Sequence, residues 1–430
     1  MRRGRHHGRR VLVSGRAGSI GPSPADHASA YGRGSICASS SDSRYPPKLR
    51  WAGIATVLAD RRGFRYHPAV ATSLGLGGSA TLAHPKGGCV MLIRSKAPVR
   101  ICDIGGWTDT RFAGSGVVVN FAVDLYAHVI VFESDATPGS AEPRIEIDAL
   151  DMGERIELGH TRDIEYDGVL DLLKAAVVRM GVDRSLRIVI WSDTPPGCGM
   201  GTSSSVGVAL LAALGLAVGK PLPRHSLAEL AHALEVEELK IECGVQDQYA
   251  AAFGGVQFME VDFPHVRTSP LDLSEDFVHE LNERFLVAYT GQSRLSDDVH
   301  RNVIRNYRAG AGQEREAIGT LRSCAHEMKN ALLGQDFGRM GEIMNANWEA
   351  QKQLHPMITT PAIETAVSVA FANGAVGAKA NGAGGGGSLT FLCAPGMEFQ
   401  VRQALLELPG IRILPCSIAR EGVRSWHSPR

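Results

Sequence analysis

The sequence lacks the features that mark several large classes of protein. Its eight cysteines are scattered without a CxxC pair, which indicates neither a zinc site nor a disulfide framework. The 45 basic and 45 acidic residues cancel, so no general field attracts nucleic acid or an anionic membrane. The longest apolar run, 206–218, is too short and too interrupted by glycine to span a bilayer. We therefore expect a cytoplasmic globular protein, monomeric or dimeric, without nucleic-acid or membrane partners.

The chain is long enough, at 430 residues, for two domains with sizeable cores. Residues 1–90 are rich in Arg, Ser, Gly and Ala, poor in acids, and show no helical or strand period. We predict a disordered extension or a start site placed too early. A transit peptide and a basic arm that binds nucleic acid stay open as alternatives. Regular patterning begins at Met91, and the predicted domains cover 91–265 and 280–430.

Hydrophobic periodicity predicts strands and helices along both domains. Strands are expected at 92–100, 117–123, 127–133, 144–150, 155–158 and 186–191, and a helix at 167–180. Ser226 and Glu229 have capping-box spacing at the start of another helix. The second half has the pattern of β-α-α-β-α-β, with strands at 285–289, 388–393 and 411–418. This order is typical of an α+β layer fold.

The most informative stretch lies between the strand 186–191 and an apolar helix. Alternating glycines allow φ > 0 and a close backbone approach to a bulky ligand. The helix that follows offers free N–H groups and a positive dipole end to phosphate, and the hydroxyl groups suit phosphate oxygens or Mg²⁺. No Gly-Lys-Ser/Thr follows, so this is not the common P-loop, and a Gly/Ser-rich connector is the alternative interpretation. The candidate phosphate-binding residues are Pro196, Gly197, Cys198, Gly199, Met200, Gly201, Thr202, Ser203 and Ser204.

Two further glycine-bearing segments, 100–109 and 379–387, accompany this loop. Together the three resemble the GHMP kinase superfamily (galactokinase, homoserine kinase, mevalonate kinase and phosphomevalonate kinase) over residues 91–430. Pro195 to Ser203 matches the motif Pro-x-Gly-x-Gly-Leu-Gly-Ser-Ser, with Met for Leu and Thr for the first Ser. Segments 97–100 and 105–109 are similar to sugar 1-kinases. Segments 246–255 and 347–352 are similar to D-glycero-D-manno-heptose 7-phosphate kinases. Trp107 is more like the L-fucokinases, and the Glu-His-Thr-Asp signature of galactokinases is absent.

The resemblance implies a first domain like ribosomal protein S5 domain 2 and a ferredoxin-like second domain. It also implies a sugar kinase that uses ATP and Mg²⁺ to phosphorylate an anomeric hydroxyl, as heptose 7-phosphate kinases do. L-fucose or another hexose stays open as the substrate. A sensor that binds sugar and ATP without turnover is the alternative of another class.

The resemblance assigns roles to individual residues. Asp247 is the expected base and Arg100 the cation beside it, while Ser203 with Glu235 or Glu237 would hold the metal. Sugar contacts are expected from Trp107, Gly106, Asp109, Gly384 and Gly385, and Lys379 with 382–387 would close the phosphate loop. Arg294 or Lys352 would pair with a sugar 7-phosphate. Taken singly, each of these residues also has an ordinary structural explanation. It could be a turn residue, form a surface ion pair, lie on the solvated face of a helix, or pack in the core.

Overall fold

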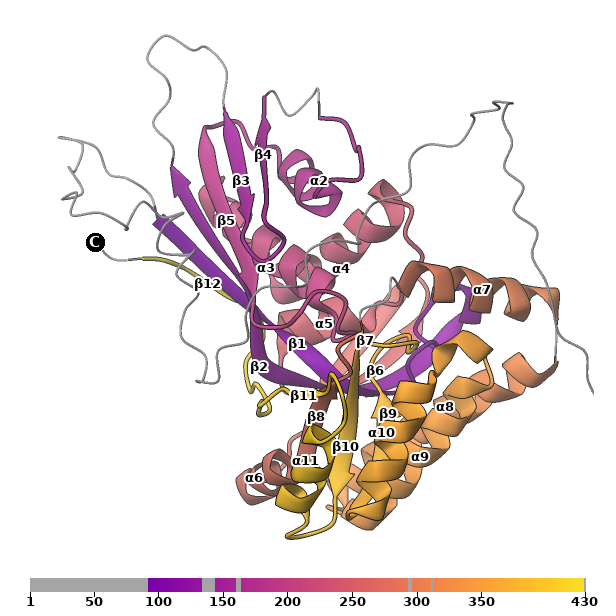
Figure 1. The fold of residues 1–430 in the computed structure, drawn as a ribbon. Helices are drawn as coiled ribbons and strands as arrows, with labels where there is room; N and C mark the ends of the chain where they lie inside the picture. Colours follow the sequence, from indigo (N-terminus) through magenta and orange to yellow (C-terminus); the bar gives the residue numbers. More distant parts are fainter. Residues whose placement is uncertain (1–91, 134–143, 160–163, 293–295, 311, 429–430) are drawn as a thin grey trace, which may run out of the picture. The chain divides into compact units, whose positions relative to one another are not determined.

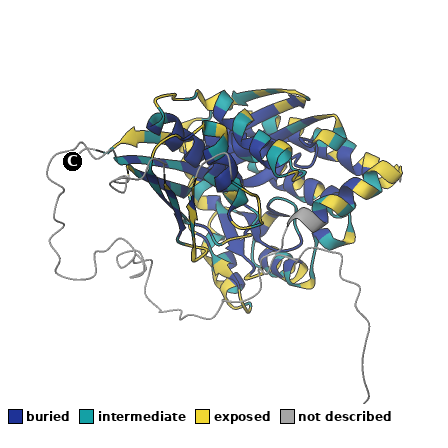
Figure 2. Cartoon of the chain, turned by 90° about the horizontal axis from the view of Figure 1, so that it is seen from above, coloured by how far each residue is buried: buried dark blue, intermediate teal, exposed yellow. Residues whose placement is uncertain are grey.

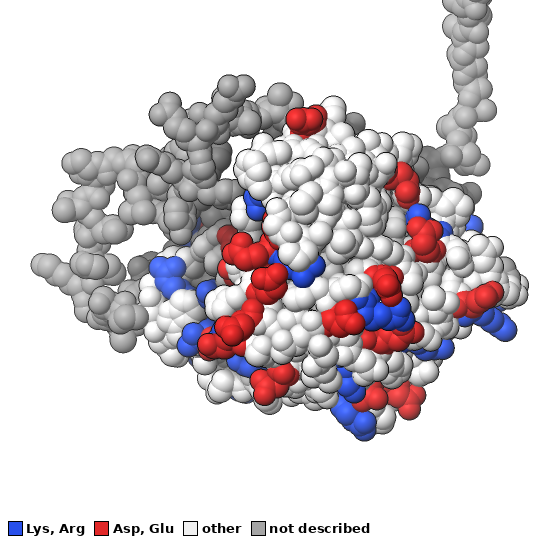
Figure 3. Space-filling view, turned by 90° about the horizontal axis from the view of Figure 1, so that it is seen from below, with Lys and Arg blue, Asp and Glu red and all other residues white. Residues whose placement is uncertain are grey.

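The computed structural model describes residues 92–133, 144–159, 164–292, 296–310 and 312–428 (Figure 1). The extension expected at 1–90 lies outside the described residues. The described part contains an eight-stranded and a four-stranded sheet with helices packed on them, which confirms the expected α+β class. None of its helices is both long enough and apolar enough to cross a membrane. On the face shown in Figure 3, acidic and basic side chains are intermingled over the surface.

The first sheet is organised around β2 (Ser115–Glu133), which pairs along much of its length with β1 (Leu92–Ile104). The expected strands 117–123 and 127–133 are therefore parts of one strand. The interruption between them is a bulge opposite Pro98 and Val99, where proline has no N–H to donate to the ladder. The other strands of this sheet are β3 (Ile145–Ala149), β4 (Glu154–Leu158), β5 (Leu186–Ser192), β6 (Val256–Asp262), β7 (His265–Pro270) and β12 (Arg424–His427).

Four helices contribute to the core on the first sheet: α2 (Asp171–Met180), α3 (Thr202–Ala217), α4 (Arg224–Ala233) and α5 (Gln246–Phe253). α3 lies at their centre and is buried on nearly all sides because its sequence is apolar all round. Figure 2 shows buried residues concentrated in the interior of the described part. The expected capping box is wrong: α4 begins at Arg224 after Pro223, so Ser226 lies inside the helix. A π-helical turn, Leu234–Glu238, continues α4.

The second sheet has the order β11-β8-β10-β9, with antiparallel neighbours throughout. Its strands and helices are β8 (Phe285–Tyr289), β9 (Ala375–Ala380), β10 (Ser388–Cys393), β11 (Arg412–Ile413), α6 (Glu275–Arg284), α7 (Ser296–Ala309), α8 (Gly312–Leu333), α9 (Phe337–Lys352), α10 (Pro361–Ala372) and α11 (Glu398–Leu406). The expected β-α-α-β-α-β order misses α7, α10 and β9. The closing strand expected at 411–418 is shorter in the structure and consists of β11 alone. After β11 the chain runs back to the first sheet, where β12 pairs with β1. The domain bounds stay a prediction, although β12 pairs with the first sheet.

A buried ion pair links the two sheets. Lys379 on β9 is fully buried, and its Nζ lies 2.9 Å from Oδ1 of Asp103 on β1, which is 2% exposed. The backbone N–H of Gly382 donates to the same Oδ1 at 3.0 Å. Burial opposes the charge of Asp103, but Lys379 and Arg100 outweigh it and lower the pKa of this carboxyl below its ordinary value. The pair therefore connects β1 with the segment 379–387.

We predict that Asp103→Asn destabilises the fold by about 3 kcal/mol or more, because it leaves the ammonium of Lys379 buried without a counter-charge. Urea unfolding followed by tryptophan fluorescence measures the change. Glu275→Gln is the matched control, since Glu275 pairs with Arg420 on the surface and its loss should change the stability far less. Equal losses in both variants would contradict a structural role for the buried pair.

Candidate functional site

The three glycine-bearing segments meet at one cavity of about 420 Å³. They come from the end of β1, from the loop between β5 and α3, and from the loop between β9 and β10. The cavity therefore brings together residues as far apart in the chain as Arg100 and Gly386. Its lining includes Arg100, Trp107, Asp109, Gly197, Cys198, Gly199, Gly201, Thr202, Ser203, Ser204, Glu235, Asp247, Gly382 and Gly384.

The loop before α3 has the geometry of an anion cradle. Gly197, Gly199 and Gly201 have φ of 69°, 77° and 72°, a region that favours glycine. A Cβ on Gly201 would lie 2.9 Å from Cγ of Asp247, and one on Gly199 would lie 2.8 Å from the carbonyl oxygen of Asn381. The first N–H groups of α3 have no acceptor within the helix and carry its positive dipole end. A phosphate group fits both features.

Two residues expected in this loop do not line the cavity. Pro196 is exposed outside the lining, and the side chain of Met200 is buried in the hydrophobic core. Met200 still contributes through its backbone, because its carbonyl accepts a hydrogen bond from the N–H of Arg100 at 3.0 Å. This bond fixes the loop against β1.

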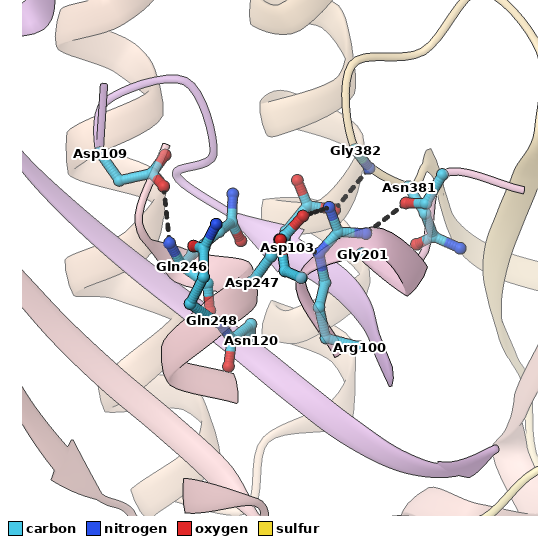
Figure 4. Close-up of polar contacts among 12 residues, drawn as sticks. Arg100, Asp103, Asp109, Asn120, Gly201, Gln246, Asp247, Gln248, Asn381 and Gly382 are labelled. Carbon is cyan, nitrogen blue, oxygen red and sulfur yellow. Dashed lines mark hydrogen bonds and ion pairs between the residues drawn. The ribbon is translucent and has the colours of Figure 1, made fainter. Parts of the chain in front are cut away.

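Arg100 and Asp247 face each other at the centre of the site (Figure 4). Nε of Arg100 lies 2.7 Å from Oδ1 of Asp247, and Nη2 lies 3.1 Å from Oδ2, so the contact is bidentate. Nη1 of Arg100 donates to the carbonyl of Gly199. Burial disfavours the charge of Arg100, but Asp247 and Asp103 more than compensate and raise the pKa of Arg100. The side chain of Asp247 stays 23% exposed, so its carboxylate is accessible from the cavity.

Asp247 lies in the first turn of α5, whereas the sequence predicted a loop. The run of alanines that follows extends the helix back to Gln246. An acidic residue in a first helical turn interacts favourably with the helix dipole. The helix therefore gives this carboxylate a defined direction that a loop would not.

Asp109 is 1% exposed and lies beside the start of α5. Its Oδ2 accepts a hydrogen bond from the backbone N–H of Gln246 at 3.0 Å, and its Oδ1 has no partner in the structure. Burial raises the pKa of this carboxyl to about 6. Trp107 is 5% exposed, packs on the His300 ring at a centroid distance of 4.6 Å, and has an unpartnered Nε1. Both side chains thus retain hydrogen-bonding capacity at the cavity wall.

The structure separates the two candidate metal-binding glutamates. Glu235 is buried at the cavity, and its Oε1 accepts a hydrogen bond from Oγ of Ser204 at 3.0 Å. Burial raises the pKa of Glu235 to about 7. Glu237 is exposed and lines a separate depression. Among the described residues, no three His, Cys, Asp or Glu side chains form a metal-binding group. Glu235 and Ser203 supply hard oxygen donors, which fits Mg²⁺ held partly by other oxygens.

The loop between β9 and β10 differs in part from the expectation. Lys379 lies on a strand and pairs with Asp103, so it does not close the cavity. Gly384 lines the cavity, whereas Gly385 donates its N–H to the carbonyl of Ile358 at 2.6 Å and lies outside the lining. Gly106 also lies outside the lining. A Cβ added to Gly106 would lie 2.5 Å from Oδ2 of Asp103.

The candidate cations for a sugar phosphate are not brought to the cavity. Nζ of Lys352 lies 2.8 Å from Glu349, and Lys352 is absent from the lining. Arg294 lies outside the described residues. Arg100 is therefore the single Lys or Arg among the described lining residues.

Sequence reasoning assigned no role to Asp103 or Asn381. Oδ1 of Asn381 accepts the backbone N–H of Cys102 at 2.9 Å, and thereby holds β1 against the β9–β10 loop. Both residues were within the glycine-bearing segments, but their partners are 276 and 279 positions away. No local spacing signals such contacts.

Three comparisons with known proteins all find similarity to kinases. Residues 168–255 match the model of the GHMP kinases N terminal domain, and 328–407 match GHMP kinases C terminal. The chain is 30% identical, over 78% of its length and 98% of the relative, to D-glycero-alpha-D-manno-heptose 7-phosphate kinase of Campylobacter jejuni. It is 28% identical, over 78% of its length and 33% of the relative, to the bifunctional fucokinase/GDP-fucose pyrophosphorylase of Arabidopsis thaliana. A D-glycero-D-manno-heptose 1-phosphate kinase structure from Bacteroides thetaiotaomicron superposes with a TM-score of 0.65 at 27% identity, covering 79% of this chain and all of that one.

We predict that Gly201→Ala destabilises the fold more than Gly219→Ala. Both glycines have φ near +70°, so an alanine at either position costs about 1–2 kcal/mol in backbone strain. Only at position 201 does the new Cβ also collide with Asp247, whereas position 219 is open. The free energy of unfolding of each variant in urea measures the difference. Equal losses would show that the loop does not press on Asp247.

We also predict a pH-dependent effect of Asp109→Asn. The pKa of Asp109 is raised from 3.8 to about 6 on folding, so the native state holds this proton more tightly and loses stability as pH rises through that range. The variant lacks this loss and keeps an acceptor for Gln246. Its free energy of unfolding relative to the unmodified protein should therefore rise between pH 4 and 6, then level off. A constant difference from pH 4 to 7 would contradict the raised pKa.

Proposed function

This chain belongs to the GHMP kinase family and is an ATP-dependent sugar kinase, and we propose that it phosphorylates the anomeric hydroxyl of a heptose 7-phosphate. The observation that carries the site assignment is the Arg100–Asp247 pair, which lies against the turn at Gly201 inside one cavity. We propose a heptose 7-phosphate because the relative of which the chain covers 98% is named D-glycero-alpha-D-manno-heptose 7-phosphate kinase.

The pair suits phosphoryl transfer to an alcohol. In our proposal the carboxylate of Asp247 accepts the proton of the attacking hydroxyl. Arg100 holds that carboxylate in a bidentate contact and offsets negative charge that develops on the transferred group. Asp109 and Trp107, which both line the cavity, would contact the sugar. Such positioning and charge stabilisation provide most of the catalysis in phosphoryl transfer.

The cradle formed by 197–204 would hold the ATP phosphates through backbone N–H groups and the hydroxyls of Thr202 and Ser203. Glu235 and Ser203 would hold Mg²⁺, which would neutralise phosphate charge. The six described cysteines are free thiols, which supports a reducing compartment such as the cytoplasm.

One observation favours a neutral sugar such as L-fucose as a second candidate. Among the described lining residues, Arg100 is the only Lys or Arg, and it is already engaged by Asp247 and Gly199. A sugar phosphate brings a dianion that needs a cation or backbone donors. The test is ADP release with heptose 7-phosphate, the dephosphorylated heptose and L-fucose in parallel. A higher kcat/KM for L-fucose than for heptose 7-phosphate would overturn the heptose assignment.

We predict that Asp247→Asn lowers kcat by about 10²–10⁴-fold while the dissociation constant for ATP changes little, because the base is lost and the cradle remains. Stopped assays of ADP formation and calorimetric titration with ATP measure the two quantities. Asp183→Asn, a change at a largely exposed carboxylate, is the control and should leave both unchanged. Undiminished kcat in Asp247→Asn would refute the role of this residue, and no turnover by the unmodified protein would support a sensor.

A further inference from the structure

The carboxylate of Glu235 is held by donors from three separate elements. Oγ of Ser204, on α3, donates to Oε1 at 3.0 Å. Nε2 of Gln248, on α5, and Sγ of Cys243, in the segment before α5, donate to Oε2 at 3.1 and 3.2 Å. Glu235 itself lies in the π-helical turn, a distortion that often marks functional positions.

The distribution of these donors makes the two oxygens of Glu235 unequal. A carboxylate oxygen offers about two acceptor positions. Oε2 receives two hydrogen bonds and is saturated, whereas Oε1 receives one and keeps one position open. The open position belongs to the oxygen beside Ser204, at the cavity that also contains Ser203.

We propose that Cys243 is a positioning residue for the metal site: its thiol, together with Gln248, occupies Oε2 and reserves Oε1 of Glu235 for the cation. This inference rests on the proposed role of Glu235 as a metal ligand. The thiol acts as a hydrogen-bond donor, so a hydroxyl at the same position replaces it in function, whereas a methyl group does not. Without the donor, Oε2 has an open position and the carboxylate loses one of its three restraints.

The test is the binding of Mn²⁺, used as a paramagnetic probe, to the full chain saturated with a non-hydrolysable ATP analogue. Cys243→Ala should weaken Mn²⁺ binding by about tenfold, the lower range for loss of a group that orients a metal ligand. Cys243→Ser should bind Mn²⁺ nearly as the unmodified protein does. Cys416→Ala, a change at a half-buried thiol outside the cavity, is the matched control and should have no effect.

The activity readout separates positioning from general damage. The Mg²⁺ concentration for half-maximal activity should rise about tenfold in Cys243→Ala, while KM for the sugar stays constant. Equal weakening in Cys243→Ala and Cys243→Ser would show that the thiol acts by packing and would overturn the inference.

Glu235→Gln distinguishes failure of the inference from failure of the metal assignment. If this variant loses Mn²⁺ affinity and Cys243→Ala does not, the positioning role is wrong and the metal role of Glu235 stands. If Glu235→Gln binds Mn²⁺ normally, both the metal role and the inference are wrong.

Discussion

The contact between Arg100 and Asp247 is the interaction on which the site depends. The same guanidinium holds Asp247 on α5 and the carbonyl of Gly199 in the phosphate cradle. One side chain from β1 therefore fixes the distance between the proposed base and the proposed phosphate site. Because Arg100 is buried, these contacts are formed at low dielectric and exchange little with water. An exposed arginine at this position would hold neither group firmly.

Residues of α9, β10 and the loop between β9 and β10 complete this arrangement. Asn381 accepts the N–H of Cys102, and Asn347 accepts the N–H of Gly105, so both bonds hold the end of β1. Oγ of Ser388 donates to the carbonyl of Cys198 in the cradle at 2.8 Å. These polar contacts are buried, and loss of any one of the side-chain partners would leave a buried backbone group unsatisfied. The cleft geometry is thus a property of the packed pair of sheets.

The sequence was sufficient for the fold class, the family and about half of the described residues that line the cavity. The cradle could be recognised because its glycines, hydroxyls and flanking strand and helix are local in the chain. Glu235 and Glu237 could not be told apart, because burial depends on a π-helical turn that no spacing reveals. Lys379 was placed in a loop because glycines surround it, but pairing with β10 makes it a strand residue. Long-range partners of this kind are determined by tertiary packing and leave no local pattern.

The electrostatics of the cavity also agree with a polyanionic ligand, although its described lining includes five carboxylates: Asp103, Asp109, Glu235, Glu242 and Asp247. Asp103 and Asp247 are held in ion pairs, so their charges are compensated within the protein. Burial raises the pKa of Asp109 to about 6 and that of Glu235 to about 7, so both carry less negative charge than exposed acids would near neutral pH. Repulsion of a triphosphate is thereby reduced before any cation binds. The positive end of α3 then provides attraction where the phosphates are expected, and the remaining carboxylate oxygens are available to hydroxyl groups.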